Sequence, residues 1–247
     1  MRIFLAGATG VIGQRLTPLL IAAGHEVTGT TRASDKAAAL KGQGAQAAIV
    51  DVFDRNAMRE AAVAARPEVV IHQLTDLPQV FDPARRGEAL VRNAKLRIEG
   101  TANLVAAAQA AGARRLISQS IAFIYADGPE PHAESAPLAS PEGDDLNALT
   151  ARGVRALEDA TLNTPGIDGI VLRYGRLYGP GTWFAAATGR GPLHVDAAAQ
   201  AALLAVSRGG PGIYNIAEDD GAVTVEKARR ELGFDPGFRL KLGAQPL

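Results

Sequence analysis

The chain has 247 residues, of which 47% are hydrophobic, 5% aromatic and 21% charged, with 26 basic residues against 26 acidic ones. This length suits one large domain with a sizeable buried core, and a formal net charge of zero argues against bulk electrostatic binding to nucleic acid or anionic membranes. The absence of cysteine excludes disulfides, thiolate catalysis and iron–sulfur ligation.

Short β-type runs alternate with helical stretches through the first 174 residues. Strands are expected at 3–6, 26–30, 47–50, 69–72, 115–119 and 169–174. Helices are expected at 11–23, 36–41, 54–65, 88–111, 147–162, 196–207 and 223–232. Parallel neighbouring strands need crossover connections, so this alternation predicts an α/β fold with a Rossmann-type, doubly wound parallel sheet.

A glycine-rich turn joins the first strand to the first helix, with the sequence Gly7-Ala8-Thr9-Gly10-Val11-Ile12-Gly13. Glycines at such a junction allow a tight turn, close approach of a pyrophosphate to the backbone, and close packing of the helix on the sheet. The start of the helix then offers free N–H groups to phosphates. The turn therefore predicts a dinucleotide site. Its contacts are expected from Gly7, Thr9, Gly10, Val11, Ile12 and Gly13.

The Gly-x-x-Gly-x-x-Gly spacing resembles the extended and atypical branches of the short-chain dehydrogenase/reductase superfamily, which include the NAD(P)-dependent epimerase/dehydratase family. Later segments extend this resemblance in the same order along the chain. They include Glu99-Gly100-Thr101, Ser118-Gln119-Ser120, Leu172-Arg173-Tyr174-Gly175, Tyr178-Gly179-Pro180-Gly181 and His194-Val195-Asp196. The resemblance implies a dinucleotide-binding domain over residues 1–174. The resemblance also implies a small, shortened substrate lobe over 175–247, interleaved with the last elements of that domain.

The resemblance also assigns cofactor contacts at the ends of later strands. Asp51 and Val52 follow the third strand and are expected on the adenine side. His72, Gln73 and Leu74 end the fourth strand and are expected on the nicotinamide side.

The end of the second strand bears on the choice of cofactor. NAD-preferring enzymes place a carboxylate there to bind the ribose hydroxyls, whereas this chain has Thr31 followed by Arg32, with Lys36 nearby. A guanidinium suits a 2′-phosphate, so we expect NADP(H) to be preferred, with NAD(H) possible. The alternative is that Arg32 is an ordinary solvated loop residue.

The acid/base pair that the resemblance implies, Tyr-x-x-x-Lys, occurs nowhere in the chain. Counting back from Glu158 places Thr150 and Val154 at the two positions. The remaining catalytic candidates are Ser120, to hold a substrate oxygen, and Tyr125, as a substitute acid. Either residue could instead have a structural role.

The substrate lobe is short, because only 182–193 separates the Tyr-Gly-Pro-Gly and His-Val-Asp segments. Tyr178, Trp183 and Phe184 are expected to line a pocket for a small molecule, although the last two could simply fill the core. In relatives, the long helices after the fourth and fifth strands often form the four-helix interface of a homodimer, so a homodimer is possible here.

Other sites and locations are not indicated. None of the four histidines has metal-ligand spacing, so no metal is expected. No apolar run approaches the roughly 20 residues of a membrane span. The glycine turn also comes too early for a signal peptide, so we expect a cytoplasmic protein that binds neither membrane nor nucleic acid.

Three hypotheses follow. The first is an NADP(H)-dependent oxidoreductase that acts on a small carbonyl or alcohol. The second is a non-catalytic NADP(H)-binding sensor or scaffold, motivated by the missing tyrosine–lysine pair. The third is an epimerase or dehydratase, which the short lobe disfavours.

Overall fold

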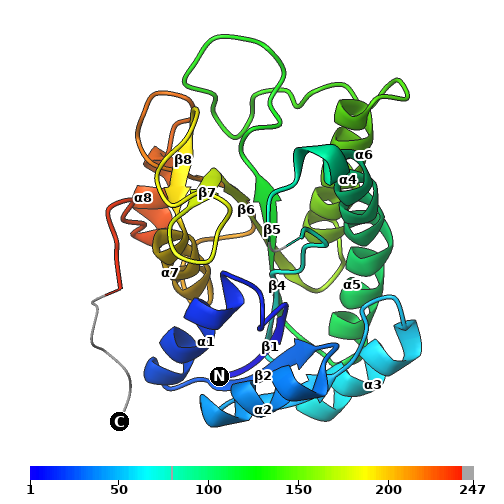
Figure 1. Cartoon of the computed structure of the whole chain (residues 1–247). Helices are drawn as coiled ribbons and strands as arrows, with labels where there is room; N and C mark the ends of the chain where they lie inside the picture. Colours follow the sequence, from blue (N-terminus) through cyan, green and yellow to red (C-terminus); the bar gives the residue numbers. More distant parts are fainter. Residues whose placement is uncertain (79, 241–247) are drawn as a thin grey trace.

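A computed structural model describes residues 1–78 and 80–240, in which helices cover both faces of a central seven-stranded sheet (Figure 1). The last seven residues of the expected substrate lobe, 241–247, lie outside the described residues. The boundary between the two expected domains, at 174/175, stays a prediction.

The main sheet is entirely parallel, and its strand order is β3-β2-β1-β4-β5-β6-β9. Its strands are Arg2–Ala6 (β1), Glu26–Thr31 (β2), Gln46–Ile49 (β3), Val69–His72 (β4), Arg115–Ile121 (β5), Asp168–Tyr174 (β6) and Gly212–Ile216 (β9). The order runs outward from β1 in both directions, which confirms the predicted doubly wound fold. The point of reversal, between the carboxyl ends of β1 and β4, is where this architecture binds ligands.

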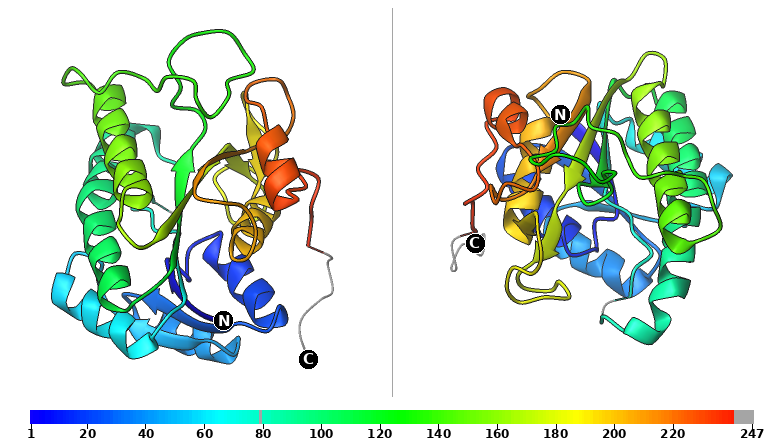
Figure 2. Two further views of the ribbon diagram at one scale, coloured as in Figure 1. Left: turned by 180° about the vertical axis from the view of Figure 1, so that it is seen from behind. Right: turned by 90° about the horizontal axis from the view of Figure 1, so that it is seen from above.

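Two helical layers sandwich the sheet (Figure 2). One layer holds α1 (Gly13–Ala22), α2 (Ser34–Gly42), α7 (Val195–Ala205) and α8 (Glu226–Leu232), and the other holds α3 (Arg55–Ala65), α4 (Arg86–Lys95), α5 (Thr101–Ala110) and α6 (Leu146–Leu162). Strand residues alternate between the two cores. In β1, Ile3 and Leu5 pack toward α1 while Phe4 and Ala6 pack toward α3 and α5. The continuous apolar runs of the sequence are therefore strands buried on both faces.

The expected helix over 88–111 is interrupted. It divides into α4, a π-helical turn at Leu96–Gly100 (η2) and α5, preceded by a short 3₁₀ turn at Pro83–Arg85 (η1). At Gly100 a Cβ would lie 3.1 Å from Val52 Cγ1, so the π turn lies tightly against the segment that follows β3. Continuous helical periodicity gives no sign of such a turn.

The C-terminal part contains three strands that the sequence analysis did not identify. β9 completes the main sheet beside β6, and β7 (Arg176–Tyr178) pairs with β8 (Pro192–His194) in a separate two-stranded sheet. The last helix begins at Glu226 rather than 223, because Val223 and Val225 enter a small buried cluster with Ala122 and Ala217.

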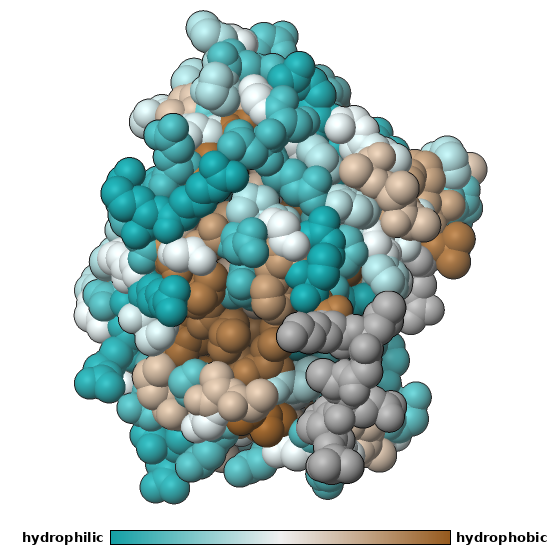
Figure 3. Space-filling model, turned by 90° about the vertical axis from the view of Figure 1, so that its left-hand side faces the viewer, coloured by the Kyte–Doolittle hydropathy of each residue, from teal (hydrophilic) through white to brown (hydrophobic). Residues whose placement is uncertain are grey.

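Apolar side chains gather on the face that carries α1, α7 and α8 (Figure 3). Half-buried residues that pack against the core here are Leu19 and Ile21 of α1 with Leu203 and Leu204 of α7. Across residues 1–78 and 80–240, no helix is long and apolar enough to cross a membrane. The cytoplasmic location stays a prediction.

Candidate functional site

The glycine turn has the conformation that close approach of a ligand requires. Gly7 has φ +91°, and a Cβ there would lie 2.6 Å from the Gln73 carbonyl oxygen. A Cβ at Gly13 would collide with the backbone of Gly7 and Ala8. Ile12 stands at the N-cap of α1 without a side-chain cap. The Gln14 N–H donates to the Gly10 carbonyl at 2.9 Å, whereas the N–H groups of Ile12 and Gly13 have no acceptor in the described chain and are left for an anion.

The turn lies directly beside the end of β4. The Gln73 N–H donates to the Ala6 carbonyl at 2.8 Å, and the Gln73 Nε2 donates to Tyr174 Oη at 3.1 Å. The Gln73 Oε1 is buried and accepts no hydrogen bond from any described residue. A buried acceptor without a donor in this crevice fits a ligand that carries hydroxyl or amide groups, so the residues present suit a dinucleotide.

His72 points away from solvent at the same strand end. Its Nδ1 accepts from the Leu74 N–H at 3.2 Å, which leaves a proton on Nε2 to donate to Thr101 Oγ1 at 3.0 Å. Burial, aided by the charge of Arg97, lowers the pKa of His72 to about 4. His72 is therefore neutral at physiological pH, and both ring nitrogens are occupied within the fold.

The residues expected on the adenine side stand at the end of β2 or after β2 and β3, and their contacts with a cofactor stay predictions. Thr31 is buried and its hydroxyl accepts from the Ala33 N–H at 3.2 Å, while Arg32 and Lys36 are exposed. Neither cation has an ion-pair partner among residues 1–78 and 80–240. Asp51 is exposed, and its Oδ1 accepts from the Phe53 N–H.

The hydroxyl of Ser120 belongs to a buried ion-pair network. It donates to Glu158 Oε1 at 2.7 Å, and the same carboxylate accepts from Arg173 Nε at 2.9 Å and from Arg173 Nη2 at 2.6 Å. All three residues are at most 4% exposed. Ser120 has one hydroxyl proton, and in this geometry that proton is donated in the hydrogen bond to Glu158.

Tyr125 lies on the other side of Arg173. Its hydroxyl donates to Asn215 Oδ1 at 2.6 Å and accepts from Arg173 Nη1 at 2.8 Å. Burial raises the pKa of Tyr125, although Arg173 opposes that shift. The catalytic roles expected of Ser120 and Tyr125 stay predictions.

The positions of the absent acid/base pair lie on α6. The Thr150 hydroxyl donates back to the Leu146 carbonyl at 2.7 Å, and Val154 is fully buried against Ile124 and Ala151. Neither side chain can act as a phenol or an ammonium.

Arg97 is a charged residue of this region that the sequence analysis did not single out. It lies on η2, is 8% exposed, and burial lowers its pKa to about 10 despite the opposing charge of Glu158. Its sequence signal was an arginine on the apolar side of a helix, beside Leu96, Gly100 and Thr101, all of which are buried.

The loop after β4 and the loop after β7 contact each other. Trp183 Nε1 donates to the Pro78 carbonyl at 2.8 Å, and Phe81 lies 5.1 Å from the Trp183 ring and 5.9 Å from the Phe184 ring. The three rings are 36–38% exposed. Tyr178 instead donates to Glu218 and packs edge-on against His194.

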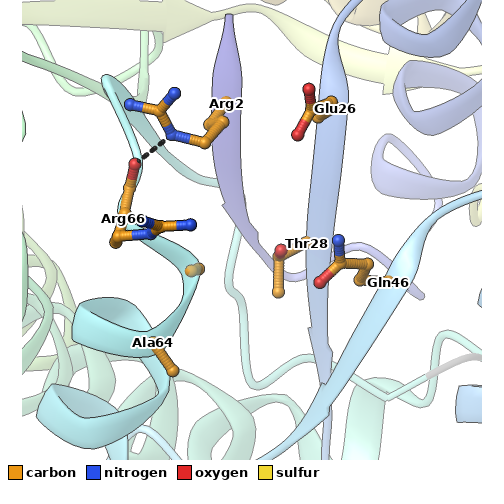
Figure 4. A pocket seen from close by; sticks show the side chains of 7 residues that line it. Arg2, Glu26, Thr28, Gln46, Ala64 and Arg66 are labelled. Carbon is orange, nitrogen blue, oxygen red and sulfur yellow. Dashed lines mark hydrogen bonds between the residues drawn. The ribbon is translucent and has the colours of Figure 1, made fainter.

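A surface pocket at the opposite edge of the sheet is unrelated to this region (Figure 4). Arg2, Glu26 and Gln46 line it at the amino ends of β1, β2 and β3, and Arg2 Nε donates to the Arg66 carbonyl at 2.6 Å. Ligands of doubly wound sheets bind at the carboxyl ends, so we do not place the cofactor there. No group of three or more metal-ligating side chains is placed to hold a metal ion within the described residues.

The sequence model described as "NAD dependent epimerase/dehydratase family" matches residues 3–191. The chain belongs to this family. The 3-diazoavenalumate denitrifying reductase of a Streptomyces species is 40% identical over 266 aligned positions, which cover 100% of this chain and 83% of the relative.

Two solved structures share the fold of this family member. UDP-glucose 4-epimerase of Thermotoga maritima, with UDP-glucose, has a TM-score of 0.76 at 19% identity, over 97% of this chain and 94% of the epimerase. A dTDP-glucose 4,6-dehydratase double mutant of Streptomyces venezuelae, with NAD bound, has a TM-score of 0.75 at 19% identity, over 96% and 92%. At these identities the structures support the fold alone.

Proposed function

We propose that this family member is an NADP(H)-dependent oxidoreductase that transfers a hydride between the nicotinamide and a small substrate. The observation that carries the proposal is the glycine turn at the β1–α1 junction, with its uncapped helix start and the unpartnered Gln73 Oε1 beside it. The 40% identical relative, named as a reductase, supports a redox reaction.

The preference for NADP(H) rests on two exposed cations. Arg32 directly follows β2 and Lys36 lies one helical turn into α2, so both can reach the ribose side of an adenine nucleotide bound at the turn. No carboxylate occupies the Thr31 position to repel a 2′-phosphate.

The hydride acceptor must suit a site in which few side chains are free to donate a proton to the substrate. A carbonyl, expected from the family resemblance, needs an acid, yet the protons of Ser120 and Tyr125 are held by Glu158 and Asn215. An arenediazonium needs no net proton. Hydride adds to its terminal nitrogen to give an aryldiazene, Ar–N=N–H. The N–H proton then leaves, the aryl C–N bond breaks, N₂ leaves and the ring carbon takes up a proton, so that ArN₂⁺ and NADPH give ArH, N₂ and NADP⁺.

We therefore propose a small aromatic diazo compound as the oxidised substrate, with a small carbonyl as the alternative. The name of the reductase relative, which specifies a 3-diazo substrate and denitrification, supports this choice. The bound cofactor supplies the hydride, while the chain supplies binding, orientation and exclusion of water.

The test uses 4-diazobenzoate and NADPH deuterated at the transferable position of C4. The expected result is N₂ release, conversion of 4-diazobenzoate to benzoate and loss of the deuterium from the cofactor, at a rate above that with Gly13→Ala protein, which controls for uncatalysed reaction. A panel of small ketones and aldehydes tests the alternative. No catalysed turnover with either class would reject the enzymatic proposal.

A cofactor-binding protein without turnover is the second candidate, favoured by Thr150 and Val154 on α6. It predicts that NADPH raises the melting temperature while its absorbance stays constant with every acceptor. If neither NADPH nor NADH changes the melting temperature, both candidates are wrong.

A further inference from the structure

Arg97 lies near the carboxyl ends of the neighbouring strands β4 and β5. Its π turn packs through Gly100 against Val52, which follows β3. The residue after Gly100, Thr101, accepts the hydrogen bond from His72 at the end of β4. Glu158 accepts the hydrogen bond from Ser120 of β5, and its negative charge raises the pKa of Arg97. Arg97 therefore lies on the ligand-binding edge of the sheet, on the α5–α6 side of the crevice.

Arg97 has no partner for its charge. Across residues 1–78 and 80–240 it makes neither a hydrogen bond nor an ion pair, although it is 8% exposed. Glu158 does not neutralise it, because both carboxylate oxygens already accept from Arg173 and one also accepts from Ser120. Glu158, Arg173 and Arg97 together carry one uncompensated positive charge.

A second buried donor stands one turn earlier on the same helix. Asn93 is 3% exposed, and its Oδ1 accepts from the Asp76 N–H at 3.0 Å. Its Nδ2 donates to no acceptor in the described chain. Residues four apart on a helix share a face, so Asn93 and Arg97 present free donors to one region.

This arrangement costs stability unless something compensates it. Arg97 is 8% exposed, so its guanidinium loses much of its hydration without gaining a counter-ion. A π turn is itself a rare element that is often retained at functional sites. A ligand that brings one negative charge removes the imbalance. The planar fork of arginine matches a carboxylate or a phenolate oxygen.

We propose that Arg97, assisted by the Asn93 amide, binds an anionic oxygen of the substrate, either a carboxylate or a phenolate. This inference deepens the proposed function and rests on it for the identity of the crevice. The anionic end of the substrate lies against η2, and the reacting end extends from it toward the cofactor crevice beside Gln73. A neutral substrate of the same shape binds poorly.

The first test measures binding without turnover. Benzoate, 4-nitrophenolate and neutral benzamide are titrated by NMR against the wild type, Arg97→Met, Arg97→Lys and the exposed control Arg59→Met. We expect both anions to bind the wild type and Arg59→Met and to bind Arg97→Met at least tenfold more weakly, with Arg97→Lys between them. Benzamide should bind none of them. Equal affinity of the anions for the wild type and Arg97→Met, or no binding to the wild type, overturns the proposal.

The second test separates a ligand anchor from a structural residue. Methionine fills similar volume without charge, so Arg97→Met should leave the melting temperature unchanged or raise it by a few degrees. A clear fall would assign Arg97 a structural role and overturn the proposal. NADPH affinity, measured on the same variants, should not change. If the wild type binds benzoate through Arg97 but binds no NADPH, the proposed oxidoreductase is wrong and the anion site stands.

Discussion

Glu158 is the residue that organises the side chains at the ends of β5 and β6. Its two oxygens accept three hydrogen bonds, two from Arg173 and one from Ser120, and Arg173 in turn donates to Tyr125. The residues that the family resemblance marks as catalytic candidates are thus linked through one buried carboxylate. Its negative charge also offsets part of the charge of Arg173 and Arg97.

Removing that charge should be costly. Glu158→Gln keeps the shape but leaves Arg173 buried without its paired anion, so we expect a loss of about 3–5 kcal/mol in the free energy of unfolding. Urea denaturation measures it, with the exposed Glu99→Gln as the control. A loss below about 1 kcal/mol would mean that the network contributes little to stability.

His72 should make stability depend on pH. Its pKa in the folded protein is about 4, below its ordinary value of 6.5, so the unfolded chain binds a proton that the folded one does not. The contribution of His72 to the free energy of unfolding is fully present above about pH 6.5. It falls by up to about 3 kcal/mol as the pH drops toward 4. Urea denaturation at several pH values gives the free energy of unfolding of the wild type and of His72→Gln. The difference, wild type minus variant, should shrink as the pH drops from 6.5 toward 4. A constant difference would contradict the buried neutral imidazole.

At the scale of elements, the loop after β4 packs against the loop after β7. They contribute Phe81 on one side and Trp183 with Phe184 on the other, and the indole N–H of Trp183 reaches the Pro78 carbonyl. The contact joins a loop that follows β4 of the main sheet to a loop of the C-terminal part. The expectation that Trp183 and Phe184 touch substrate is compatible with this packing and stays a prediction.

Trp183→Ala should loosen both loops. The variant loses the ring contact with Phe81 and the bond to Pro78, so we expect tryptic cleavage after Arg85 or Arg86 to accelerate about tenfold, as local opening becomes easier by about 1–2 kcal/mol. Trp183→Phe retains the ring packing and should show a smaller effect. Unchanged cleavage in both variants would show that the loops are held by other contacts.

The sequence was sufficient for the elements whose periodicity is regular and insufficient for those set by packing. The strands of the first half and the glycine turn were predicted because buried parallel strands are apolar throughout. The π turn escaped because it changes helical phase by one residue while its apolar pattern continues. β9 escaped because Gly212–Ile216 is short and follows a loop rich in glycine.

The residues of the candidate site also fall into a group that could be predicted from the sequence and a group that could not. Backbone-determined positions such as Gly7 and Gly13 could be located from their residue type, since only glycine fits where a Cβ would collide. Side-chain partnerships could not be predicted, because they join residues far apart in the chain. The bond from Ser120 to Glu158 spans 38 residues, and Arg97 became visible only as a buried cation without a partner.

On the scale of the whole molecule, Arg15 joins the C-terminal segment to the glycine turn. Its Nε pairs with Asp196 Oδ1 at 2.8 Å at the start of α7, its Nη1 donates to the Val11 carbonyl, and its Nη2 donates to the Pro180 carbonyl. The segment after residue 174 therefore closes against α1 and contributes β9 to the sheet. One buried cluster contains side chains from both sides of residue 174. The division into two domains stays a prediction.

The expected homodimer also belongs to this scale. Val91 on α4 and Ile98 on η2 are 51% and 41% exposed and lie about two helical turns apart, on the helical layer that the family resemblance assigns to a four-helix interface. We propose that they pack against a second copy, so sedimentation equilibrium should give twice the chain mass of 25.7 kDa. Val91→Glu with Ile98→Glu buries like charges at such an interface and should yield monomers, whereas Val63→Glu, at the 43% exposed site on α3, should not. A monomeric wild type, or a dimer that survives the double substitution, would place the interface elsewhere or exclude it.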